Sequence, residues 1–155
     1  PIEGLTIQGS AAATGDQTGT SGINGTEQGT SANVGAKYTM GGITVGYTEG
    51  GYQAAIASGE LVYYENKFYG IQFDVNDNLS VSYNNDESEQ NTRANVAVGA
   101  TAGTKTVVAM EQESVQLAYT VAGATIGISQ AEVTNADYTT SKEENQTVIS
   151  LGISF

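Results

Sequence analysis

The sequence predicts an all-β fold: a transmembrane, antiparallel, up-and-down β-barrel with about eight strands, in a single segment over 1–155. Three observations predict it: alternation of apolar and polar residues, alternation of short and long connections, and the confinement of charge to certain positions. No apolar run reaches the ~20 residues that a membrane helix needs. A lipid-facing strand, however, needs an apolar residue only at every second position.

The clearest strand is the last one, over 145–155. Ile149, Leu151, Ile153 and Phe155 alternate with small or polar residues. This period of two is typical of a strand with one apolar face and one polar face. An aromatic residue such as Phe155, at the end of a barrel strand, is expected in the girdle at the membrane interface.

Seven other segments show the same period, and tight turns join some of them in pairs. Turns are predicted at Gly41–Gly42, 76–78 and Ala122–Gly123, because Gly, Asn and Asp accept turn conformations readily. The predicted strands span 2–12, 33–40, 43–48, 61–75, 79–83, 113–121, 124–130 and 145–155.

The remaining connections are long and polar, and they follow every odd-numbered strand. They are predicted over 14–32, 49–59, 84–110 and 131–144, with room for an additional hairpin over 96–108. Transmembrane barrels sort their connections in this way, with short turns on one side and long loops on the other. Acidic residues are expected in these loops: Asp16, Glu27, Glu49, Asp86, Glu87, Glu89, Glu132, Asp137, Glu143 and Glu144.

Side-chain parity assigns each strand residue to the lipid or to the interior. The predicted girdle on the lipid side consists of Tyr38, Tyr47, Tyr69, Phe73, Tyr83, Tyr119 and Phe155, because a half-immersed aromatic ring suits the interface. The predicted pore lining consists of Lys37, Thr39, Thr44, Gln72, Asp74, Ser80, Ser82, Gln116, Thr125 and Ser150. These small, polar residues suit a wide, water-filled interior.

Composition excludes several classes of function. A formal net charge of −12 argues against nucleic-acid binding. The chain has no His and no Cys, so Ser–His and thiolate catalysis are excluded, and we expect no enzymatic activity. No cofactor is expected beyond loop-bound Ca²⁺ or Mg²⁺, for which the weak candidates are Asp86, Glu87, Glu89, Glu143 and Glu144.

Three segments carry a resemblance to a known family: Glu3–Ile7, the hairpin Tyr63–Tyr83 and the terminal strand that ends in Phe155. They resemble strands of Gram-negative general porins of the outer membrane. The resemblance implies a 16-stranded trimer that contacts lipid and lipopolysaccharide and lets small hydrophilic solutes and ions diffuse through a channel. It also implies that this chain is the C-terminal half, without the constriction loop. The start at Pro1 likewise favours a fragment.

The acidic residues expected in the long loops would surround the mouth of the channel. They predict mild cation selectivity, because their summed charge raises the local concentration of counter-ions. Two alternatives remain open. One is a self-contained eight-stranded outer-membrane barrel with a structural or adhesive role. The other is a surface-exposed β-sandwich that acts as a binding module, which would bury its apolar face in a core rather than expose it to lipid.

Overall fold

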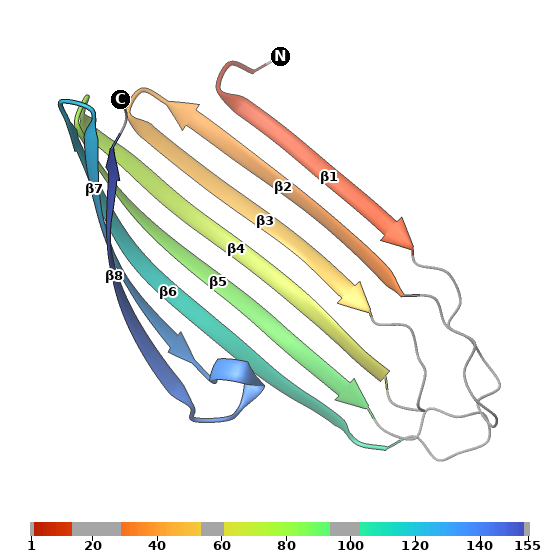
Figure 1. The fold of residues 1–155 in the computed structure, drawn as a ribbon. Helices are drawn as coiled ribbons and strands as arrows, with labels where there is room; N and C mark the ends of the chain where they lie inside the picture. Colours follow the sequence, from red (N-terminus) through yellow and green to blue (C-terminus); the bar gives the residue numbers. More distant parts are fainter. Residues whose placement is uncertain (1, 14–28, 54–60, 94–102, 154–155) are drawn as a thin grey trace.

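The computed structural model describes residues 2–13, 29–53, 61–93 and 103–153. These residues form a single antiparallel sheet of eight strands, in the order in which they occur along the chain (Figure 1). The strands are β1 (Leu5–Ala13), β2 (Thr30–Met40), β3 (Ile43–Gln53), β4 (Leu61–Asn76), β5 (Leu79–Arg93), β6 (Lys105–Val121), β7 (Ala124–Thr134) and β8 (Glu143–Ile153). A short 3-10 helix, η1 (Ala136–Tyr138), lies between β7 and β8.

Every strand pairs with its neighbours in sequence, so the topology is up and down throughout. The predicted all-β, antiparallel, eight-stranded architecture is therefore confirmed. The sheet is not closed: β1 and β8 form its two edges. Figure 1 shows these strands at opposite sides of a curved, slanting sheet.

The predicted tight turns are confirmed at one end of the sheet. Gly41 has a φ of 58°, and Ala122 and Gly123 have φ values of 50° and 81°. In the β4–β5 turn, the backbone N–H of Asn78 donates to the Asn76 side-chain oxygen at 2.9 Å. Turn chemistry was readable from the sequence because these residue types tolerate left-handed backbone or accept local hydrogen bonds.

The strands extend much further from the turns than predicted. β3 continues to Gln53, β5 continues to Arg93, and β6 begins at Lys105. The predicted loops over 49–59, 84–110 and 131–144 were therefore wrong in part. Residues 105–108 belong to β6, so they do not form a separate hairpin, while 94–102 lie outside the described residues. The end of β5 is polar on both faces, whereas the start of β6 is apolar on both faces, at Val107, Val108, Ala109 and Met110. Neither segment shows the alternation that identifies a strand.

Seven of the ten acidic residues predicted in loops lie on strands instead. Asp16 and Glu27 lie outside the described residues, and Asp137 lies in η1. The others occupy the strand ends that lie away from the turns: Glu49, Asp86, Glu87, Glu89, Glu132, Glu143 and Glu144. Acidity thus gathers at the end of the sheet remote from the turns, but on paired strands rather than in loops.

The two faces of the sheet differ in exposure. Along β3, the apolar residues Ile43, Val45 and Tyr47 are exposed, while Thr44, Gly46 and Thr48 are half-buried. β7 shows the same contrast, with Ile126 and Ile128 exposed and Gly127 half-buried. Side chains crowd together on the concave face of a curved sheet and spread apart on the convex face. The apolar residues therefore lie on the convex face.

The sheet has almost no hydrophobic core. Among the described residues, Ala136 is the one buried hydrophobic residue, at 3% exposure. The accessible surface is 10340 Å², whereas a compact soluble protein of 16.0 kDa exposes about 7,400 Å². Within the described part of the chain, no helix is both long and apolar enough to cross a membrane. The exposed large apolar residues of this sheet face outward instead of packing together in a core.

Candidate functional site: an apolar convex band and a polar concave face

The convex face carries a continuous apolar band near the turns. On β4 the band runs from Tyr69 to Val75, six residue steps, or about 20 Å along the strand. A barrel in an outer membrane presents an apolar band ~25 Å tall. The exposed residues of the band include Met40, Ile43, Val45, Ile71, Phe73, Val115, Leu117, Ile126, Ile128, Ile149, Leu151 and Ile153.

The boundary between this band and the polar strand ends is slanted. On each strand from β3 to β8, one apolar residue of the band lies farthest from the turns. In strand order these residues are Tyr47, Tyr69, Tyr83, Val115, Ile128 and Ile149. Tyr47 pairs with Tyr69, Tyr83 with Val115, and Ile128 with Ile149. Between these pairs the boundary shifts, because Tyr69 faces Asn85 and Val115 faces Gln130.

Each shift moves the boundary two residues toward the turns, so it moves four residues across the five strand spacings from β3 to β8. With a rise of ~3.4 Å per residue and strands ~4.8 Å apart, this slope corresponds to an angle of about 30°. Strands of transmembrane barrels tilt by ~35–45°. A flat membrane surface would cross tilted strands along a similar slant.

Six of the predicted girdle residues lie on the convex face, and Phe155 lies outside the described residues. Tyr47, Tyr69 and Tyr83 stand at the slanted boundary. The Tyr47 hydroxyl donates to Glu49 at 3.0 Å, and the Tyr83 hydroxyl donates to Glu113 at 2.8 Å. The rings of Tyr47 and Tyr83 therefore cover apolar surface while their hydroxyls reach the polar strand ends. Tyr38, Phe73 and Tyr119 lie nearer the turns.

The strand register places all ten predicted pore-lining residues on the concave face. Lys37 pairs with Gly46, Thr39 with Thr44, Gln72 with Ser82, and Thr125 with Gly152. The remaining ones, Asp74, Ser80, Gln116 and Ser150, follow by the same parity. Several are bonded to one another: Thr39 and Thr44 hydroxyls lie 3.1 Å apart, and Gln72 donates to Asp74 at 2.8 Å. The part of the concave face opposite the apolar band therefore bears many hydrogen-bonding side chains.

Three aromatic residues on this polar face, Tyr52, Tyr64 and Phe68, were not predicted from the sequence. Tyr52 and Tyr64 are stacked, with ring centroids 6.2 Å apart and ring planes 21° apart. Phe68 lies two pleat repeats further along, on the same face as Tyr64. They were overlooked because the predicted strand β3 stopped at Thr48 and because the aromatic parity of β4 was assigned from Tyr69 onward. The shared parity of Tyr64, Asn66, Phe68 and Gly70 would have placed the two aromatic residues of β4 on the polar face.

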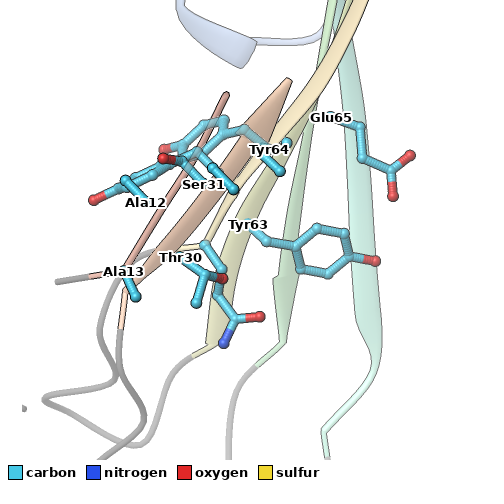
Figure 2. Close-up of a pocket in the computed structure, with 12 residues that line it drawn as sticks. Ala12, Ala13, Thr30, Ser31, Tyr63, Tyr64 and Glu65 are labelled. Carbon is cyan, nitrogen blue, oxygen red and sulfur yellow. The ribbon is translucent and has the colours of Figure 1, made fainter. Parts of the chain in front are cut away.

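Figure 2 shows how neighbouring residues of β4 diverge at the end of the sheet remote from the turns. Tyr63 and Glu65 project to one side of the strand and Tyr64 to the other. The residues drawn line a hollow of about 610 Å³, which small side chains such as Ala11, Ala13 and Ala32 leave open. Aromatic side chains therefore occupy both faces here, with Tyr64 on the concave one.

The β7–β8 connection folds over the concave face. The Asn135 side chain donates to the Ala109 carbonyl at 2.8 Å. Tyr138 packs against Tyr64 at 5.5 Å between ring centroids, and its hydroxyl lies 2.7 Å from Ser88 Oγ. Lys142 pairs with Asp137 at 2.5 Å and with Glu144 at 2.7 Å, which raises the pKa of Lys142 above its ordinary value. This connection therefore holds Tyr64 in place.

The candidate metal ligands do not form a single group. By register, Asp86 lies on the concave face and Glu87 and Glu89 on the convex face, while Glu143 and Glu144 lie on β8. Glu87 is already paired with Lys67 at 3.1 Å. Within the described ranges, no three acidic side chains cluster in a way that could hold a metal ion.

No family model matches this chain, and no match was found among curated proteins.

Proposed function

We propose that this chain forms part of the wall of an outer-membrane porin in a Gram-negative bacterium, with lipid on its convex face and water on its concave face. The slanted apolar boundary carries the proposal. In a soluble sheet, nothing requires the edge of the apolar band to be inclined to the direction of the interstrand hydrogen bonds. A wall of tilted strands in a flat membrane requires such a line.

The polar concave face supports a water-filled channel for the passive diffusion of small hydrophilic solutes and ions. The charged groups at its membrane-level part, Lys37 and Asp74, keep this interior hydrated. The exposed apolar band favours a channel wall over a β-sandwich module, since a sandwich would bury that face.

The open edges at β1 and β8 require closure within a membrane. Each unpaired backbone group in lipid costs several kcal/mol, so a spanning sheet must have no free edge. We propose that further strands of the same kind complete a 16-stranded wall and that three such barrels associate, with lipopolysaccharide around the acidic strand ends. The polar interior suits this size, because only wide barrels keep an aqueous lumen.

The function is tested by electrical recording after the native protein, purified in a detergent, is added to a planar lipid bilayer. We expect stepwise increases in current, each from the insertion of one open channel. Insertion without a measurable current in concentrated KCl would contradict the diffusion function and favour a barrel with a filled interior and a structural or adhesive role.

In a gradient of KCl, we expect the reversal potential to indicate a mild preference for K⁺ over Cl⁻. The reason is the net charge of −12, which concentrates cations near the mouth. Asp74→Asn should weaken the preference, because Asp74 lies on the concave face. The matched control is Glu113→Gln on the convex face, which should have a smaller effect. A preference for Cl⁻ in the unaltered protein would overturn this prediction.

A further inference from the structure

The connection between β7 and β8 is longer than the pairing of these strands requires. Thr134 pairs directly with Glu143, so the two strands are in register at this end. Two residues are enough to close a hairpin of this kind. The chain has eight, over 135–142. The additional residues turn back over the sheet, where the Asn135 side chain donates to the Ala109 carbonyl of β6 at 2.8 Å.

The connection lies on the concave face and extends over three neighbouring strands. η1 packs against β6 (Figure 1). Tyr138 reaches Ser88 of β5, with the two hydroxyl oxygens 2.7 Å apart, and Tyr64 of β4, with ring centroids 5.5 Å apart. Ser88 and Tyr64 both project from the concave face by register. From β7 to β4 there are three strand spacings, so the connection covers a strip of the inner surface about 14 Å wide.

Burial and hydrogen bonds fix the path of the connection. Ala136 is the one buried hydrophobic residue in the described ranges, so the best-packed apolar side chain lies here rather than in the sheet. The backbone N–H of Ala136 donates to the Lys142 carbonyl at 2.9 Å. The backbone N–H of Ser141 donates to the Asn135 side-chain oxygen, also at 2.9 Å. The connection is therefore an ordered part of the inner surface.

The backbone of Tyr138 shows that tertiary contacts hold the connection in place. Its φ of 55° lies in the left-handed region, which is unfavourable for a residue with a bulky side chain. Such a conformation persists where surrounding contacts over-determine it, and it occurs preferentially at functional sites. For Tyr138, the contacts are the Tyr64 ring and the Ser88 hydroxyl. Tyr138 is therefore the residue that anchors the connection to β4 and β5.

We propose that the β7–β8 connection is a constriction that limits the size of the solutes that pass, with Tyr138 as its positioning residue. This inference rests on the proposed channel function. A closed wall of 16 strands, ~4.8 Å apart and tilted by ~40°, would be about 32 Å across between backbones. A helical turn with its side chains is ~10 Å thick, so it would leave about two thirds of this span open. Such a constriction would be separate from the one that the porin resemblance implies outside this chain.

The test compares single channels of the native protein with those of a shortened variant in planar lipid bilayers. In the variant, residues 135–142 are replaced by the dipeptide Asn-Gly, which closes a two-residue hairpin in the existing register. The conductance should rise about 1.5-fold, the ratio of the two open spans. Polyethylene glycols of graded size, added to the electrolyte, should enter the shortened channel at a larger size than they enter the native one.

A single substitution tests the anchor without shortening the chain. Tyr138→Gly removes the ring and the hydroxyl contact, and glycine accepts the left-handed backbone without strain. Its conductance and its size limit should shift in the same direction as those of the shortened variant. Thr140→Ala, at an exposed position of the same connection, is the matched control and should behave like the native protein.

Thiol labelling measures the covering of the wall without relying on a current. The chain has no Cys, so a single introduced thiol gives the whole signal. Tyr138→Gly should accelerate the reaction of Ser88→Cys with a charged maleimide several-fold. It should not affect Ser82→Cys, which lies on the same face of β5 nearer the turns. Equal rates for Ser88→Cys with and without Tyr138→Gly would overturn the proposal.

The recordings separate this proposal from the channel function on which it rests. Native and shortened channels with the same conductance and the same size limit would overturn the constriction and leave the diffusion function standing. Channels from the shortened variant alone would support the proposal, because the connection would then block the passage completely. No channels from either protein would overturn both proposals.

Discussion

Ile71→Arg should strongly impair insertion into lipid vesicles. Ile71 lies in the middle of the convex band, paired with Val45 on one side and with Tyr83 on the other, and 47% of it is exposed. An arginine on the lipid side of a barrel costs ~2–4 kcal/mol at the bilayer midplane. The free energy of unfolding from vesicles, measured by urea titration, should fall by about this amount.

Gln72→Arg provides the matched control, because Gln72 follows directly and projects from the concave face. Its arginine would point into water, so the unfolding free energy should change by less than about 1 kcal/mol. If both variants lose stability equally, or if Ile71→Arg behaves like the unaltered protein, the convex band does not face lipid.

Gly50→Ala should destabilise the sheet by about 1–3 kcal/mol, the usual cost of overpacking. A Cβ atom at this position would lie 2.8 Å from the Ala32 carbonyl oxygen and 2.8 Å from the Asn33 Cβ. One of these neighbours belongs to the backbone of β2, so relief requires movement of the strand. The measurement is the same urea titration in lipid vesicles.

Gly46→Ala is the control for this substitution, on the same strand and the same face. Its Cβ would meet only the Ala36 carbonyl oxygen, at 3.9 Å, which is an ordinary contact. Since Gly in a strand costs ~0.5–1 kcal/mol relative to Ala, Gly46→Ala should be neutral or slightly stabilising. A loss of stability at Gly46 as large as at Gly50 would show that steric conflict with β2 is not the cause.

The sequence predicted the fold well wherever one face is apolar. The number of strands, the turns at Gly41 and Ala122–Gly123, and the side on which Lys37 and Asp74 lie all follow from parity and turn chemistry. Strand length was not predictable in the same way. Between Asn84 and Arg93, β5 is polar on both faces, and its pairing with β4 and β6 stabilises it as a strand.

The aromatic cluster on the concave face was also not predictable from the sequence. Tyr52, Tyr64 and Phe68 were visible as aromatic residues, but their position on one face depends on the register of β3 against β4. The contribution of Tyr138 depends on how the β7–β8 connection folds back, and no periodicity encodes that path. The pairing register of the strands and the path of the β7–β8 connection can be obtained only from the structure.

The strictly sequential pairing of the strands also has a consequence for how the sheet assembles. Each strand from β2 to β7 finds both of its partners next to it in the sequence, and β7 meets β8 after a connection of only a few residues. Local pairings carry a small entropic cost of loop closure, so the wall can grow one hairpin at a time. In the closed wall proposed above, joining the edges β1 and β8 to further strands would be the slow, non-local event, and mutations at these two edges should delay maturation more than they alter the finished protein.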